Sequence, residues 1–220
     1  MMFFSRCFRF LGLFFHLLRS TGQIVYGAWH VSKLKMPIVT IFGSARIKQD
    51  SHYATQAHIL GEKFLDSGIS ILTGGGPGIM EAASCTLPKG KNKGQSIGIA
   101  VKGLEDRPEK CMQTYLELDY FFARKWLLTE YSSGFVIFPG GFGTLDEMAG
   151  VLTLIQTKKI KRVPVVLIGK EYWHYFIKWV QNEGLAHGAI LSEELEYFYV
   201  TDDLDEAFCF VLGRCDLIPK

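Results

Sequence analysis

The chain has 220 residues, of which 48% are hydrophobic and 21% are charged. These proportions exclude an intrinsically disordered chain, which lacks the apolar surface to offset the entropy lost on folding. A net charge of +2 is too small to indicate nucleic-acid binding, and the length suits one sizeable α/β domain.

Charge is distributed unevenly along the chain. Residues 1–49 hold seven Lys or Arg and no Asp or Glu, which leaves 17 basic and 22 acidic residues in the remainder, a net charge of −5. The sequence therefore divides into a basic, Phe-rich leader over 1–36 and a mildly acidic domain over 37–220.

The leader has the pattern of an amphipathic helix. Its apolar run is interrupted at spacings of 3, 7, 3 and 4, which place the polar side chains on one helical stripe; these are Arg6, Arg9, His16, Arg19 and Gln23. Such a helix over residues 1–30 suits contact with a membrane surface, and the alternative is a helix that packs on the domain or in an oligomer interface. A spanning helix fits less well because of the three arginines, and a secretion signal lacks a small-x-small cleavage site.

Beyond Pro37, short apolar runs alternate with helical patterns. The runs predict buried strands at Ile38–Phe42, Ile69–Leu72, Ile97–Val101, Phe135–Phe138 and Val163–Ile168. Helices are predicted at Tyr53–Asp66 and over 119–131, 144–159, 171–183 and 202–212. This alternation is typical of a Rossmann-like, doubly wound α/β fold with a mainly parallel sheet and helices on both faces.

The five cysteines are odd in number and widely spaced. The sequence has no CxxC motif and no Cys/His pairing at zinc-finger spacing, so it predicts neither a disulfide framework nor a structural zinc site. A reducing cytoplasmic location is the simpler interpretation.

Two glycine-rich segments each follow a predicted strand and open a helix, at 73–81 and 138–147. Glycine lets the backbone approach a ligand, and the N–H groups at a helix N-terminus attract an anion such as phosphate. Tight βα turns without a ligand are the alternative, since neither segment matches GxGxxG or the Walker pattern.

A charged pair lies between these segments, and a carboxylate lies within the second. Arg124 offers a planar fork to phosphate or carboxylate, while the adjacent Lys125 is a point charge. Glu147 follows Thr144 by three residues on the same predicted helix. A Glu fixed there by cations suits contact with a ribose hydroxyl or with water attacking an anomeric carbon; ordinary surface charges and helix capping are the alternatives.

These residues resemble the signature of the LOG family, once widely labelled lysine decarboxylase-like. Residues 139–147 read PGGFGTLDE against the family's PGGxGTxxE, and FGSAR at 42–46, GGGPGIMEAA at 74–83 and the Arg-Lys pair follow the family order. The GGGPGIMEAA segment looks more like the bacterial branch of the family than the plant branch. The resemblance covers about 37–215, with no counterpart assigned for 1–36.

The resemblance implies a phosphoribohydrolase that cleaves the N-glycosidic bond of AMP or a cytokinin riboside 5′-monophosphate, giving free base and ribose 5-phosphate. Arg124 and Glu147 would be the catalytic pair, without a cofactor or metal. The substrate-binding positions carried over are Gly74, Gly75, Gly76, Glu105, Lys125, Gly140, Gly141, Phe142, Gly143, Thr144, Leu145, Asp146 and Thr153.

The implied partners are the nucleotide substrate and a second copy of the chain in a homodimer or higher homo-oligomer, with no nucleic acid. The location is cytoplasmic, at the inner face of the membrane if the leader binds lipid. Two alternatives to hydrolysis remain. One is a nucleotide-binding or sensing module without turnover. The other is an amino-acid decarboxylase, which would need a Schiff-base lysine that the sequence does not suggest.

Overall fold

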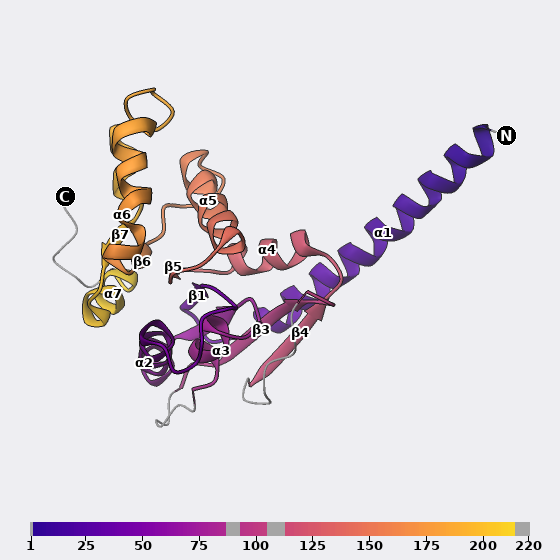
Figure 1. Cartoon of the computed structure of the whole chain (residues 1–220). Helices are drawn as coiled ribbons and strands as arrows, with labels where there is room; N and C mark the ends of the chain where they lie inside the picture. The colour runs from indigo at the N-terminus through magenta and orange to yellow at the C-terminus, as the bar shows by residue number, and fades with distance from the viewer. Residues whose placement is uncertain (1, 87–92, 105–112, 214–220) are drawn as a thin grey trace.

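A seven-stranded parallel sheet forms the centre of the molecule (Figure 1). The computed structural model describes residues 2–86, 93–104 and 113–213, with side chains from residue 10 onward. The strand order is β4-β3-β2-β1-β5-β6-β7, and every neighbouring pair is parallel. The strands are β1 (Ile38–Phe42), β2 (Ser70–Thr73), β3 (Ser96–Val101), β4 (Thr114–Leu118), β5 (Gly134–Ile137), β6 (Val165–Ile168) and β7 (Tyr199–Thr201).

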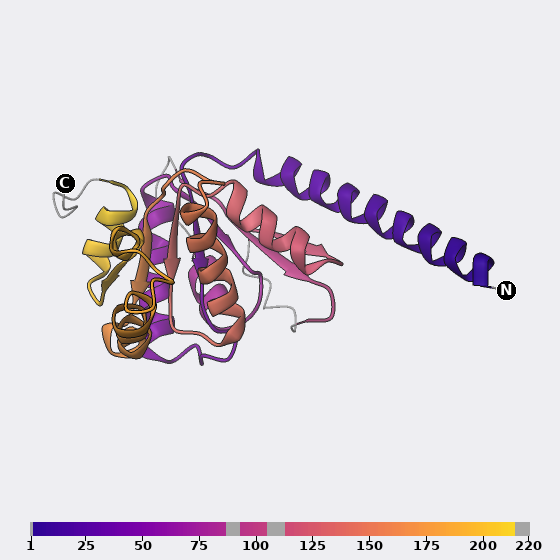
Figure 2. The same cartoon turned by 90° about the horizontal axis from the view of Figure 1, so that it is seen from above.

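Helices cover both faces of this sheet (Figure 2). One core contains residues of α2 (His52–Asp66), α3 (Ile79–Ser84) and α7 (Leu204–Val211). The other contains residues of α1 (Met2–Val31), α4 (Phe121–Glu130), α5 (Phe142–Gln156) and α6 (Lys170–Trp179). β1 contributes to both cores because successive side chains on a strand point to opposite faces. The predicted α/β, doubly wound fold is confirmed.

The chain reverses its direction of travel across the sheet beside β1. It runs from β1 outward through β2, β3 and β4, then returns to place β5 on the other side of β1. The carboxyl ends of β1 and β5 therefore flank the topological switch point, where ligands bind in sheets of this kind.

Two strands escaped prediction, and both lie at edges of the sheet. β4 has the sequence TYLEL, with only two of its five residues buried, and β7 has three residues. Neither presents the continuous apolar run that is typical of a strand buried on both faces.

The predicted helix over 171–183 is divided in the structure: α6 ends at Trp179, and a π-helical turn, η1, covers Val180–Gly184. A 3₁₀ helix, η2, covers Ser192–Tyr197.

The leader forms the single helix α1, whose C-terminal third joins the domain. Val31 and the following Leu34 are buried in the core, and Ile24 and Ala28 pack against it. This third of α1 therefore packs on the domain, which was the alternative to membrane contact in the sequence analysis. Within the part of the chain that the structure describes, none of the helices has the length and apolar character that crossing a membrane requires.

One cysteine differs from the sequence-based expectation. Cys85, directly after α3, is disulfide-bonded, although the spacing of cysteines indicated no disulfide framework. Sequence spacing does not report which cysteines the fold brings together, whereas bonding requires their Cα atoms within about 7 Å. Cys209 is a free cysteine.

The N-cap of α7 predicts how one part of the stability depends on pH. The Asp203 carboxylate accepts hydrogen bonds from the backbone N–H groups of Glu206 and Asp205, and these bonds lower the pKa of Asp203. Its contribution is therefore present above the ordinary carboxyl pKa of about 4 and is lost as pH falls through the folded value. We expect Asp203→Ala to lower the free energy of unfolding in urea at pH 7, with a difference that narrows below about pH 4.

The matched control is Asp203→Asn, whose amide oxygen still accepts both bonds. It should lose less stability than the alanine variant at pH 7, and its difference from the wild type should narrow below about pH 4 by the same amount, because the narrowing comes from protonation of the wild-type carboxylate. An alanine variant with the same deficit at pH 7 and at acid pH would contradict this role of the carboxylate.

Candidate functional site

A pocket of about 300 Å³ opens at the carboxyl ends of β1 and β5. It gathers residues that are far apart in the sequence, from the loop after β1, from α3, from α4 and from the start of α5. Its lining consists of Gly43, Ser44, Ala45, Arg46, Met80, Leu104, Phe121, Arg124, Gly141, Phe142, Gly143, Thr144 and Glu147. This is the switch-point position at which the sheet topology predicts a ligand.

A buried ion pair forms part of the pocket wall. Arg124 Nη2 donates to Glu147 Oε1 at 3.0 Å, and the two residues are only 5% and 7% exposed. The Phe121 ring lies 5.4 Å from the guanidinium carbon of Arg124. Burial of two charges is unfavourable unless they are paired and hydrogen-bonded, so the geometry fixes each side chain against the other.

Glycine is required where the loops approach this pair. A Cβ on Gly74 would clash with Arg124 Nη2 and would lie 2.7 Å from Met80 Sδ, and a Cβ on Gly140 would clash with the Thr144 side chain. Gly78 has φ of +67° and packs against the loop after β1. The glycine-rich segments thus allow the close packing of the site as well as loop reversal.

The first turn of α5 faces the pocket with unsatisfied donors. Leu145 N donates to Gly141 O, the first hydrogen bond of the helix, and no side chain caps Gly141. Backbone N–H groups before that bond have no intrahelical acceptor, and the helix dipole gives this end a partial positive charge. Arg46 adds a full charge to the same pocket, so the pocket suits an anionic group.

Other sequence-predicted residues lie beside the pocket. Lys125 Nζ pairs with Asp146 Oδ1 at 2.9 Å and donates to Asp146 O at 3.0 Å. Together with Thr153 these residues line a neighbouring hollow of about 800 Å³ between α4 and α5. Leu145 packs against the core.

The remaining predicted positions belong to three groups. Gly141, Phe142, Gly143 and Thr144 line the pocket, and Phe142 is 91% exposed. Gly74, Gly75 and Gly76 are buried behind it, and Met80 is the member of their segment that lines it. Glu105 lies outside the described residues.

Several lining residues were not predicted as site residues, notably Arg46, Met80 and Phe121. Arg46 belongs to the FGSAR segment after β1, which the sequence analysis noted as a motif. Placing Arg46 in the pocket requires the strand order as well, because only the pairing of β1 with β5 brings this segment next to the second glycine-rich loop.

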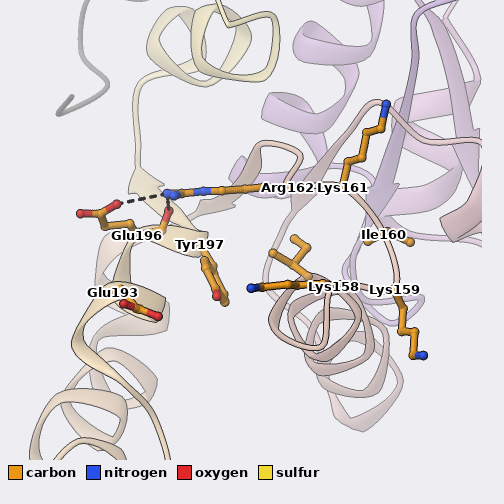
Figure 3. A pocket seen from close by; sticks show the side chains of 9 residues that line it. Lys158, Lys159, Ile160, Lys161, Arg162, Glu193, Glu196 and Tyr197 are labelled. Atoms are coloured by element: carbon orange, nitrogen blue, oxygen red, sulfur yellow. Dashed lines mark hydrogen bonds and ion pairs between the residues drawn. The ribbon is translucent and has the colours of Figure 1, made fainter.

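A second concave region, of about 560 Å³, lies beyond the C-terminal end of α5 (Figure 3). It is lined by Lys158, Lys159, Lys161 and Arg162 together with Glu193, Glu196 and Tyr197. Arg162 already pairs with Glu196, and the Lys159 and Lys161 side chains extend away from each other (Figure 3). Its charges are mixed and it holds none of the predicted site residues, so the switch-point pocket is the candidate site.

The described residues contain no group of three or more His, Cys, Asp or Glu side chains placed to hold a metal ion.

The sequence of the chain is similar to those of known proteins. The family model described as "Possible lysine decarboxylase" matches residues 79–210. The cytokinin riboside 5′-monophosphate phosphoribohydrolase LOG3 of Arabidopsis thaliana is 30% identical over 69% of this chain and 71% of its own length. The enzyme of that name from Rhodococcoides fascians is 25% identical over 79% of this chain and 88% of its own length. The probable enzyme LOGL5 of Oryza sativa subsp. japonica is 29% identical over 67% of this chain, which spans 62% of that relative's length.

Solved structures support the fold. The molybdenum cofactor binding protein of Rippkaea orientalis has a TM-score of 0.57 at 21% identity, covering 81% of this chain and 97% of that one. The molybdenum cofactor carrier protein of Chlamydomonas reinhardtii has a TM-score of 0.52 at 23% identity, covering 81% and 98%. At these identities the likeness concerns the fold alone.

The buried ion pair predicts an asymmetry between single and double substitutions. Glu147→Leu and Arg124→Met should each cost about 3–5 kcal/mol of unfolding free energy, because each leaves one charge buried and unpaired. The combination of both should recover most of that loss. Urea denaturation measures all three.

The control is Lys125→Met, which breaks the more exposed pair with Asp146 and should cost about 0–1 kcal/mol. If the two buried-pair variants lost no more than this control, the pair would be hydrated rather than buried.

Proposed function

This chain belongs to the LOG family, whose model carries the description "Possible lysine decarboxylase", and on that premise we propose that it is a phosphoribohydrolase. The proposed reaction hydrolyses the N-glycosidic bond of a nucleoside 5′-monophosphate to free base and ribose 5-phosphate. The observation that carries the proposal is the buried Arg124–Glu147 pair in the wall of the switch-point pocket.

The chemistry needs negative charge beside the ribose. Glycosidic cleavage passes through an oxocarbenium-like state with positive charge on the sugar. Glu147, held by Arg124, would contact the ribose hydroxyls, stabilise that charge and orient the attacking water. Arg124 would hold the carboxylate in place and fix the substrate geometry.

The same pocket also offers a matching environment for the phosphate. The N-terminal turn of α5 offers backbone donors and a positive helix dipole, and Arg46 offers a fork for two phosphate oxygens. Phosphate held there would place the ribose toward Glu147, since both line the one pocket. This arrangement would make the proposed reaction depend on the 5′-phosphate.

The base is proposed to be adenine or a prenylated adenine. The relatives are named for cytokinin riboside monophosphate, and acceptance of AMP is the second part of the proposal. A hydrophobic pocket distinguishes one methylene group by only about 1–3 kcal/mol, so both substrates belong in the first test.

A nucleotide-binding or sensing module is the second candidate function. It is favoured by the fold that this chain shares with a cofactor carrier protein over 81% of its length. The charged pair argues for turnover, because a binding module does not need a carboxylate beside the anomeric carbon. Amino-acid decarboxylation has no such support, since the described lining of the pocket includes no lysine for a Schiff base.

The enzyme proposal predicts that base release depends on the Glu147 carboxylate. Purified protein incubated with AMP, isopentenyladenosine monophosphate, CMP, GMP and UMP should release base from at least the adenine nucleotides. Glu147→Gln should slow release at least about 100-fold, because the amide cannot offset the positive charge on the ribose. Chromatography of the free base measures both.

The matched control is Glu193→Gln, the same change on η2 at a residue that does not line the pocket. It should leave the rate unchanged. A Glu147→Gln variant that released base at the rate of the control would sink the assignment, and binding of nucleotide without release would favour the sensing module.

We also propose that two copies associate through the hollow between α4 and α5. Phe122 and Trp126 line it and are 54% and 42% exposed, and apolar side chains of this size are typical of interface cores. The hollow also holds Lys125 and Thr153.

This association predicts the mass in solution. Light scattering should give twice the mass of one chain, and Phe122→Glu combined with Trp126→Glu should give the mass of one chain, because two carboxylates cannot be buried unpaired. The control Ile59→Glu, on the exposed side of α2, should leave the dimer intact. Wild-type protein with the mass of a single chain would contradict the proposal.

A further inference from the structure

Helix α1 packs on the domain by its polar stripe. His16 Nδ1 lies 2.7 Å from the Tyr120 hydroxyl, and Arg19 pairs with Asp119 at 2.6 Å. The Gln23 side-chain oxygen accepts from Asp119 N at 2.9 Å. On the same side, Gly27 lets Leu127 of α4 approach so closely that a Cβ would clash with it.

This orientation turns the apolar face of α1 away from the domain. Successive residues on a helix are about 100° apart, so the residues opposite the polar stripe include Phe14, Leu18, Val25 and Trp29. These four are 49%, 54%, 63% and 64% exposed. Leu11 lies on the same line, and further exposed apolar residues flank it on both sides, namely Phe10, Phe15, Leu17 and Tyr26. A helix of a soluble domain usually has the opposite arrangement, with the apolar stripe inward.

Helix α1 extends well past the domain. Among the side chains that the structure describes, hydrogen bonds from α1 to the domain begin at His16, and the preceding turns of the helix add about 20 Å at 1.5 Å per residue. Both views show this half of the helix projecting from the rest of the molecule (Figures 1 and 2). The domain lies on the polar side of α1, so it does not block a flat surface that approaches from the apolar side.

We propose that this face of α1, defined by Phe14, Leu18, Val25 and Trp29, docks the protein on an anionic phospholipid surface. Charge complementarity favours lipid phosphate, because α1 contains no acidic residue and Lys33 and Lys35 directly follow it. Aromatic and basic groups meet at the end of α1 nearest the domain, where Lys33 Nζ lies 4.6 Å from the Trp29 ring centroid. Trp with neighbouring Lys is typical of the membrane–water boundary.

The width of the apolar face favours lipid over a second copy of α1. A helix that pairs with another helix buries a narrow seam, whereas the exposed apolar residues of α1 flank the central line on both sides. A helix lying in the lipid headgroup boundary buries its whole apolar side. The proposal concerns location and is independent of the reaction at the switch-point pocket.

Co-sedimentation with vesicles tests the proposal on the full chain. Protein should pellet with phosphatidylcholine vesicles that contain phosphatidylglycerol, and less with phosphatidylcholine alone. Phe14→Glu combined with Leu18→Glu should weaken partition into the vesicles at least about tenfold. Burial of either apolar side chain in lipid alone should raise the partition constant by about tenfold or more. Circular dichroism and base release of this variant should match the wild type, since neither residue contacts the domain core.

The control is Ile59→Glu combined with Tyr175→Glu, which places two charges on exposed apolar residues of α2 and α6. It should pellet as the wild type does. Equal loss in both double variants, or no pelleting of the wild-type chain, would overturn the proposal. A different result would also overturn it: a wild-type chain that does not pellet but forms an oligomer, which the Phe14→Glu and Leu18→Glu double variant dissociates in light scattering. In that case a second copy of the chain would cover the apolar face.

Discussion

The ion pair between Arg124 and Glu147 is the interaction on which the candidate site depends. Each side chain is almost fully buried, and neither charge would be tolerated there without the other. Arg124 comes from α4 and Glu147 from α5, so the pair holds two helices in one geometry across the carboxyl ends of the central strands. A carboxylate fixed in this way needs little rearrangement to meet a developing positive charge, which is the source of electrostatic catalysis.

The fold creates this constraint through the order of its strands. Placing β5 beside β1 brings the loop after each strand to the same edge of the sheet. The Gly74 segment supplies the space that the guanidinium occupies, and α5 begins where its free N–H groups face the pocket. Positive charge from Arg46 and the helix dipole is thus combined with one negative carboxylate, the combination that a phosphorylated ribose needs.

Sequence reasoning reached the central sheet and the charged pair because both leave strong local signals. The strands buried on both faces read as apolar runs, and the glycine segments mark the turns that follow them. The edge strands β4 and β7 left no such run. Arg46 and Phe121 could not be assigned to the pocket, because their place depends on non-local strand order. The orientation of α1 was also beyond the sequence: the polar stripe was visible, but its contacts with Asp119 and Tyr120, which turn the apolar side outward, depend on the folded domain.

The most direct test of the account is the fate of a nucleotide and its nucleoside in the presence of the purified chain. AMP and isopentenyladenosine monophosphate are incubated beside adenosine and isopentenyladenosine, and base and ribose 5-phosphate are quantified together. We expect base and ribose 5-phosphate in equal amounts from a monophosphate and no cleavage of either nucleoside, because the proposed site holds the substrate by its phosphate at the α5 N-terminus. Monophosphates that bind to the protein but release no base, even with protein in molar excess, would contradict the proposed hydrolysis.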